Sequence, residues 1–179
     1  MIHLPPPEAT TPVPPPAESD PQPSETVANT MDVVTLGPDE TLTVQNPQVN
    51  AQVSVDGGVI RGSRADTIVA ESDAESNLFS SEPVHGYEYL MVHIRIKNTD
   101  DYSLAVSPYF DLPVYVSGVS YNEENLELEG YPVLEPTTLL SNEEIHGWMV
   151  YMVPVGGESA ELAYEPLLPD EPLGFIRLS

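Results

Sequence analysis

The sequence predicts an all-β protein, an antiparallel β-sandwich that follows an extended, proline-rich N-terminal arm. Three observations support this prediction: many short β-branched runs separated by turn residues, one longer segment in which apolar side chains recur every second residue, and no convincing amphipathic helix. The composition changes near residue 36, so we expect an arm over residues 1–35 and a single domain over residues 36–179.

Proline defines the arm. Residues 1–23 contain nine prolines, which favour extended polyproline II and leave nothing to pack a core. At about 3.1 Å per residue, this stretch would reach roughly 70 Å as a semi-rigid stalk. No apolar run approaches the roughly 18 residues of a membrane span, and no charged-then-apolar leader begins the chain. We therefore expect no membrane span, and either a chain used without export or a mature form.

The clearest strand of the domain is Tyr89–Asn98, because its apolar residues recur with a period of two. The residues expected to face the core are Leu90, Val92, Ile94 and Ile96, and those expected to face outward are Met91, His93, Arg95 and Lys97. The Asp-Gly-Gly at 56–58 predicts a turn, and Glu71–Phe79 is predicted to hold at most one helical turn. Further strands are predicted at Thr41–Val44, Ala51–Val55, Thr67–Glu71, Leu104–Val106, Leu112–Val116, Leu126–Leu128, Trp148–Val153, Leu162–Tyr164 and Phe175–Leu178.

The composition excludes several classes of function. The chain carries 29 acidic residues against five Lys and Arg, a formal charge of −24, and it contains no cysteine. Five cations cannot build a basic face, so nucleic acid and anionic membranes are excluded as default partners. Without cysteine there is no disulfide, thiolate catalysis or Cys-ligated zinc. Because the acids run throughout the domain, we interpret the charge as typical of a halophilic source, with an acidic mesophilic protein as the alternative.

Several strand segments share their pattern with a known family. They are Leu90–Thr99 with its Asn-Thr turn, Gly147–Pro154, Glu161–Tyr164, and Leu42–Val44 before Asn46-Pro47. On these segments the chain resembles the telokin-like, immunoglobulin-like domains of prokaryotic, notably haloarchaeal, secreted lipoproteins of unknown function. The resemblance covers about residues 40–179 and implies an immunoglobulin-like antiparallel β-sandwich. The acylated cysteine and leader of that family are missing here, and the family shares no catalytic residues, so the resemblance implies neither an anchor nor an activity.

Catalytic and metal-binding motifs are missing from the sequence. There is no Gly-x-Ser-x-Gly element and no phosphate-binding glycine loop, so we expect neither an enzyme nor a cofactor. His85, His93 and His146 lack the spacing of metal ligands, and we interpret them as scattered surface residues. The acidic pairs are interpreted as solvated, with weak cation association as the alternative; these pairs are Asp100-Asp101, Glu123-Glu124 and Glu143-Glu144.

Two of the five cations, Arg95 and Lys97, are expected to project from the same face of one strand, which they share with His93. Each cation is expected to lie opposite a carboxylate on a neighbouring strand. The functional alternative is that the pair docks an acidic surface of a partner. This face is therefore the first candidate for an interaction site.

Aromatic residues supply the other candidate contacts. Trp148 is the only tryptophan, and we expect it to pack in the core, with an exposed binding anchor as the alternative. Gly147 before it is expected to let the chain turn tightly into the strand. Tyr109 and Tyr115 belong to a tyrosine-rich stretch that either packs long loops or forms a contact surface.

Together these observations favour a non-catalytic structural or adhesive module that makes protein–protein contacts outside the cytoplasm, at the cell surface or beyond it. The partner is expected to be another protein or a second copy of the chain, engaged with the help of the arm at residues 1–35. One alternative is a virion component, a capsid decoration or turret protein of a haloarchaeal virus. Another is a solute- or metal-binding surface lipoprotein domain, which would need a pocket.

Overall fold

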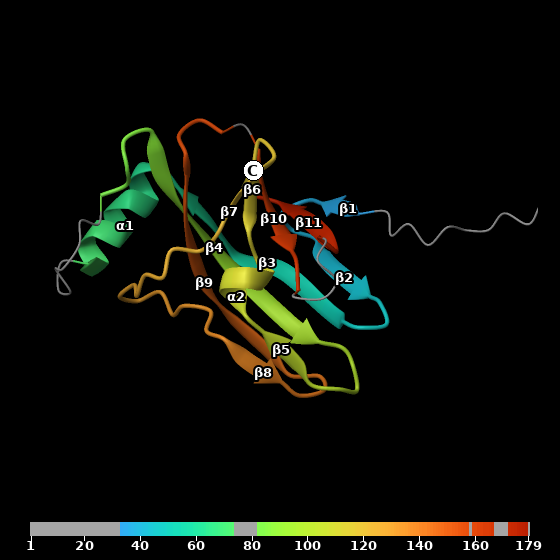
Figure 1. Cartoon of the computed structure of the whole chain (residues 1–179). Helices are drawn as coiled ribbons and strands as arrows, with labels where there is room; N and C mark the ends of the chain where they lie inside the picture. Colours follow the sequence, from blue (N-terminus) through green and yellow to red (C-terminus); the bar gives the residue numbers. More distant parts are fainter. Residues whose placement is uncertain (1–32, 74–81, 158, 167–171, 179) are drawn as a thin grey trace, which may run out of the picture. The chain divides into compact units, whose positions relative to one another are not determined.

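The computed structural model describes residues 33–73, 82–157, 159–166 and 172–178 (Figure 1). Of the predicted arm, residues 1–32 lie outside the described residues, and so does most of the predicted helical turn at 71–79. The described residues form eleven β-strands and two helices.

One face of the molecule is a four-stranded antiparallel sheet in the order β2-β3-β4-β9. Its strands are β2 (Thr41–Gln45), β3 (Asn50–Arg61), β4 (Tyr87–Asn98) and β9 (Glu144–Pro154). The central strand β4 and the edge strand β9 stay in register over eleven residue pairs, from Tyr87 opposite Pro154 to Lys97 opposite Glu144. This sheet carries most of the candidate interaction residues.

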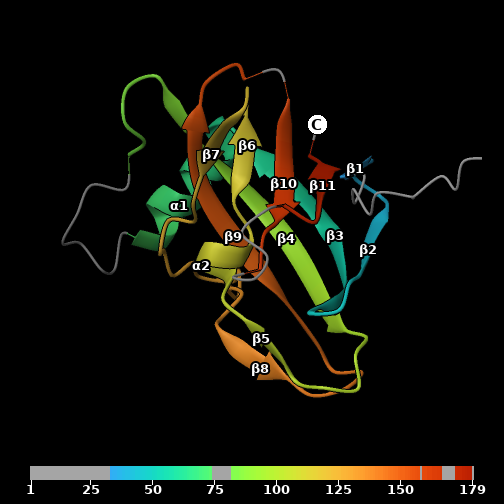
Figure 2. The same ribbon diagram turned by 45° about the vertical axis from the view of Figure 1, so that its right-hand side comes forward.

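The second layer is a five-stranded sheet in the order β1-β11-β10-β6-β7, and a small two-stranded ribbon, β5-β8, lies beside the layers. Figure 2 shows β6, β10 and β11 in front of β4 and β9. All neighbours in this sheet are antiparallel except β1 and β11, which are parallel. The bounds are β1 (Val34–Leu36), β11 (Gly174–Arg177), β10 (Ala160–Tyr164), β6 (Val114–Val116), β7 (Val119–Tyr121), β5 (Leu104–Val106) and β8 (Thr137–Leu139).

The main core lies between the two sheets and follows from the period-two pattern. Leu42 of β2 and Ile94 of β4 are buried against Leu162 of β10 and Ile176 of β11. Tyr151 of β9 is fully buried among them and donates its hydroxyl to the Leu112 carbonyl at 2.7 Å. The prediction of an all-β antiparallel sandwich is confirmed.

The prediction of a strand at Thr67–Glu71 is wrong, because helix α1 (Ser63–Asp73) occupies that position. One local and one tertiary hydrogen bond accompany the helix in this β-prone stretch. The Thr67 hydroxyl donates to the Ser63 carbonyl at 2.8 Å, and the Asp66 carboxylate accepts the backbone N–H of Tyr89 in β4 at 2.9 Å. The helix is thereby bonded directly to the sheet.

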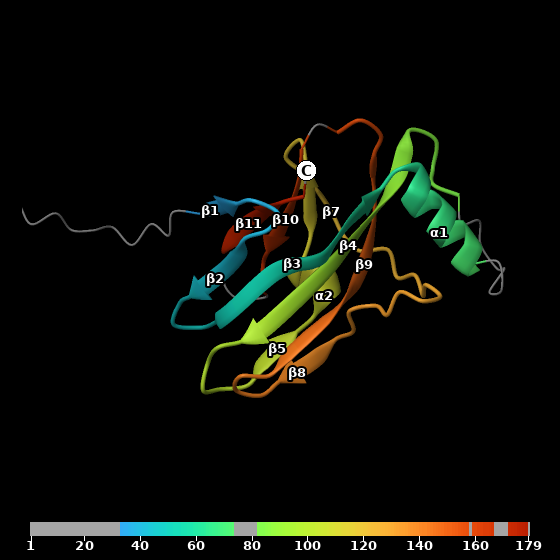
Figure 3. The same ribbon diagram turned by 180° about the vertical axis from the view of Figure 1, so that it is seen from behind.

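Helix α1 covers one end of the outer face of the four-stranded sheet and creates a second core there (Figure 3). Ala65 and Val69 of α1, one turn apart, pack on Met91 of β4 and Val150 of β9. Met91 thus lies on the outer face, as its period-two position predicts, but it is fully buried there because α1 covers it.

Two other local expectations are also wrong. The Asp-Gly-Gly at 56–58 makes no turn between strands; it forms a β-bulge inside β3, where the register to β4 shifts between Val55 and Val59. Gly57 and Gly58 adopt positive φ angles of 82° and 107°, which explains the need for glycine at the bulge. The predicted strand Leu126–Leu128 is irregular and contributes one isolated bridge, from Leu128 to Tyr131.

Candidate binding surface

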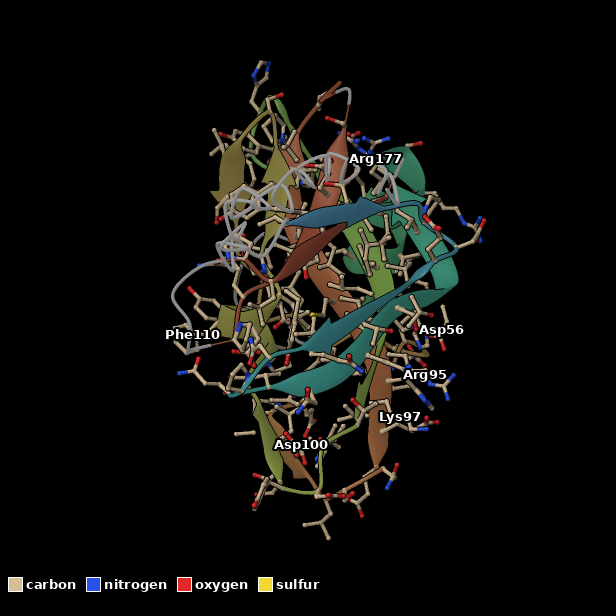
Figure 4. The ribbon with its side chains drawn as sticks, turned by 90° about the vertical axis from the view of Figure 1, so that its right-hand side faces the viewer. Asp56, Arg95, Lys97, Asp100, Phe110 and Arg177 are labelled. Carbon is tan, nitrogen blue, oxygen red and sulfur yellow. The ribbon has the colours of Figure 1, made fainter. Side chains whose placement is uncertain are left out.

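The outer face of the four-stranded sheet divides into two halves. The apolar half lies under α1 and the loop that follows β7, whereas the other half is exposed to solvent. We call this second half the open polar face; its residues are Thr41, Gln52, Ser54, Arg95, Lys97, Glu144 and His146. Figure 4 shows Arg95 and Lys97 extending from the same side of the sheet, with Asp56 next to them.

Arg95 forms an ion pair across the strands. Its Nη2 lies 2.5 Å from Oε2 of Glu144 on β9, although the residue directly opposite Arg95 is His146. Glu144 is instead opposite Lys97, so the pair is diagonal. The carboxylate expected for Arg95 is present, and it is the same one that the register places opposite Lys97.

Lys97 therefore has no ion-pair partner of its own among the described residues. Its half-buried side chain borders a hollow of about 120 Å³ whose lining contains no acidic group. Two cations, two hydroxyls and one amide face this hollow, which suits a carboxylate oxygen pair from outside the chain. The lining residues are Thr41, Gln52, Ser54, Arg95 and Lys97.

His93 lies at the border between the open polar face and the second core. Its Nδ1 contacts the backbone carbonyl of Asp56 and lies 2.7 Å from Oδ1 of that residue, which the bulge in β3 turns toward the histidine. Its ring lies 5.7 Å from the ring of His146 and 5.1 Å from that of Trp148. Within the described part of the chain, no three His, Cys, Asp or Glu side chains are arranged to hold a metal ion.

Trp148 packs in the second core rather than between the sheets. It is half-buried, and its ring meets that of Tyr131 edge-on at 5.3 Å. The backbone of the covering loop comes so close to β9 that a Cβ on Gly147 would lie 2.6 Å from the Leu134 nitrogen. Gly147 thus lies inside β9 and permits this close approach, which corrects the expectation that it makes a turn.

The two candidate tyrosines lie away from the open polar face. Tyr115 is on β6 of the other sheet, where its hydroxyl donates to Glu165 Oε1 at 2.6 Å and its ring meets Phe175 edge-on at 5.6 Å. This hydrogen bond, with burial, raises the pKa of Tyr115. Tyr109 belongs to helix α2 (Pro108–Asp111) and contacts Phe110 edge-on at 5.0 Å. The structure therefore brings together Arg95, Lys97, His93 and Trp148 only.

One acidic residue differs from the solvated role expected of it. Glu123 is half-buried beside β9, where it forms an isolated bridge with Tyr151. Burial raises the pKa of Glu123 to about 7. The sequence gives no local signal for this, since Glu124 follows it and the stretch is otherwise polar.

The fold is a β-sandwich whose four-stranded sheet leaves one polar half of its outer face open to solvent. The sequence model of a domain of unknown function, DUF4352, matches residues 61–172, more than half of the chain, and the protein belongs to this family. No curated protein sequence matches it. No helix of the described residues is long and apolar enough to cross a membrane.

Two solved structures share the fold. The proposed lipoprotein YcdA of Bacillus subtilis is 16% identical with a TM-score of 0.57 over 80% of this chain, which corresponds to only 38% of YcdA. The secreted protein MPT63 of Mycobacterium tuberculosis is 14% identical with a TM-score of 0.55, over 80% of this chain and 96% of its own. At these identities the similarity concerns the fold alone.

Proposed function

We propose that this protein is a non-catalytic module that makes protein–protein contacts outside the cytoplasm, and that it docks a carboxylate of its partner on the open polar face. The observation that carries the proposal is Lys97, a partly buried residue that lines the hollow and lacks an ion-pair partner among the described residues of a chain with 29 acids. Arg95 adds a second cation at the same hollow.

Charge and geometry support this choice of partner group. Two cations that line one hollow without an acidic neighbour in the lining attract an anion, and the hydroxyls and the amide beside them can donate to it. A carboxylate in the hollow would compensate Lys97 and accept from Gln52 and Ser54 as well. Because molar salt has a screening length of about 3 Å, it weakens this contact less than it weakens the longer-range repulsion of the overall charge of −24.

The location and the lack of catalysis are supported by different observations. The structural neighbours are described as a secreted protein and a proposed lipoprotein, which favours a place outside the cytoplasm. The open polar face offers cations, hydroxyls and amides, but it holds no hydroxyl nucleophile bonded to a histidine base. This chemistry favours binding over turnover.

Lys97 is the only lysine in the chain, which permits a direct test. A carbodiimide joins a carboxyl to an amine without a spacer, so it can join a docked carboxylate to Lys97. The probe is an acetylated, fluorescent ten-residue polyglutamate peptide, with polyglutamine as its neutral match, in the lowest KCl concentration that keeps the chain folded. We expect a cross-link to Lys97 with polyglutamate only.

Three variants distinguish the positive charge at position 97, which binding needs, from the lysine amine, which the cross-link needs. Lys97→Arg should bind the peptide but form no cross-link, Lys97→Gln should weaken binding at least fivefold, and Arg177→Gln on the other sheet should bind as the wild type does. The proposal fails if Lys97→Gln binds as tightly as the wild type, or if the cross-link forms only at the N-terminal amine.

A further inference from the structure

A second concave site lies on another part of the molecule. The loop of residues 122–136, between β7 and β8, encloses a cavity of about 470 Å³ together with α2. We call it the loop cavity. Most of its wall is apolar, and this size is typical of pockets that hold a small organic ligand. The apolar lining residues are Pro108, Tyr109, Leu126, Val133, Leu134 and Pro136.

Backbone hydrogen bonds hold the loop against β9, so the cavity is already formed in the free chain. At one end, the Glu124 N–H donates to the Val150 carbonyl at 2.7 Å. At the other end, the Trp148 N–H donates to the Pro132 carbonyl at 2.8 Å, and the Leu134 N–H donates to the Trp148 carbonyl at 3.0 Å. A ligand that enters this cavity would therefore lose little binding free energy to ordering of the loop.

The polar part of the lining is acidic. Three carboxyl side chains, Glu123, Glu127 and Glu135, line the loop cavity together with the amide of Asn125, and no cation does. None of the three forms an ion pair with another described residue. Negative charge thus converges on an apolar pocket without an internal counter-ion.

We propose that the loop cavity binds a small organic cation, an ammonium or guanidinium group carried on an apolar body. The apolar wall would bury the body, Tyr109 would offer its ring face to the cation, and the three carboxylates would compensate the charge. A bare metal ion fits poorly, because much of the wall offers no ligand and the described residues hold no metal-ligand cluster. This proposal is independent of the open polar face.

Glu123 makes the binding dependent on pH. Tyr151 of β9 is its bridge partner, and the other titratable groups that line the same cavity are Tyr109 of α2 and Glu127 and Glu135 of the loop. Burial, and then the charge of Glu123, raises the pKa of Tyr151, which stays a neutral donor. Because the pKa of Glu123 is about 7, a cation that needs its charged form should bind up to about tenfold more weakly at pH 6 than at pH 8.

The test uses benzyltrimethylammonium as the cation on an apolar body. Benzyl alcohol is the neutral match, benzoate the anionic match, and sodium ion the cation without a body. Isothermal titration calorimetry measures affinity, and backbone amide NMR shifts locate the ligand. We expect only benzyltrimethylammonium to bind with shifts at Leu126 and Val133, with affinity falling from pH 8 to pH 6.

Two matched variants complete the test. Glu123→Gln should weaken binding at least fivefold at pH 8 and abolish its pH dependence between 6 and 8. Glu124→Gln removes the same charge one residue away, outside the lining, and should bind as the wild type does. The proposal is overturned if benzyl alcohol binds equally well, if the shifts map elsewhere, or if the two variants behave alike.

Discussion

Three acidic side chains show how much one kind of residue can differ within one molecule. The Asn50 amide donates to Asp100 at 2.8 Å and lowers the pKa of that carboxyl. Burial raises the pKa of Asp111, although its carboxylate accepts the Ser107 N–H at 2.6 Å. Burial also raises the pKa of Glu123 to about 7. Contacts, rather than composition, therefore decide which acids are charged at neutral pH.

Replacing Glu123 with glutamine tests this raised pKa through stability. An unfolded glutamate has a pKa of about 4.3, so the folded chain holds this proton more tightly. The stability gained from the protonated carboxyl is complete below the unfolded pKa and is lost as the pH rises through 7. Glu123→Gln cannot ionise, and we expect it to exceed the wild type by about 1–2 kcal/mol at pH 8, after solvent screening is allowed for, and by less than half of that at pH 5.

Urea unfolding at the two pH values measures the difference. Glu124→Gln serves as the control and should show no such change with pH. Equal effects of both variants would mean that the general negative charge, rather than the burial of Glu123, governs the result.

The sequence predicts the open polar face, but it does not predict the loop cavity. The shared face of Arg95 and Lys97 follows from a period of two within one strand, which is a local property. The burial of Glu123 depends on α2 and on a loop held to β9, and no local pattern encodes these contacts between distant segments. The same holds for Gly147, whose role depends on the backbone at Leu134.

At the scale of elements, the sequence predicts the long strands and some of the short ones, such as β5 at Leu104–Val106. Strand β4 is long enough for its period of two to stand out, and β9 for its nearly continuous apolar run. No strand is predicted at β1, β7 or β8, which have three residues each, and β7 (Val-Ser-Tyr) and β8 (Thr-Thr-Leu) lack the apolar runs that mark the equally short β5 and β6. Helix α1 was missed because Thr67, Ile68 and Val69 are β-branched, and only its packing on the sheet favours the helix.

The burial of Met91 is the point at which the structure differs from the simple alternation of exposed and buried residues in β4. Alternation places it outside with Lys97, whereas the structure buries it under α1. Met91→Ala should therefore lower the free energy of unfolding by about 2–4 kcal/mol, because it removes buried apolar volume beneath the helix. Lys97→Ala, on the same face but in the open half, should change it by no more than about 0.5 kcal/mol. Chemical denaturation of both variants decides; similar small effects would show that α1 does not pack there.

At the scale of the whole molecule, three of the five cations form ion pairs with carboxylates among the described residues. Arg61 pairs with Glu88 at 2.6 Å and also donates to the carbonyls of Pro154 and Gly157, tying the start of β4 to the end of β9. Arg95 and Arg177 each have one carboxylate partner. Against a formal charge of −24, such pairs cannot offset the mutual repulsion of the remaining acids.

That repulsion predicts a strong dependence of folding on salt. The screening length is about 10 Å in 0.1 M salt and about 3 Å in 1 M salt, so molar salt largely removes repulsion between exposed acids. We expect circular dichroism to show a folded β protein in molar KCl and an unfolded chain in dilute buffer, and NaCl of equal ionic strength to act like KCl. Sucrose, which strengthens burial without screening charge, should not replace the salt. Identical thermal unfolding curves in molar KCl and in dilute buffer would refute the halophilic interpretation. They would show that repulsion between the acidic residues does not lower the free energy of unfolding in dilute buffer.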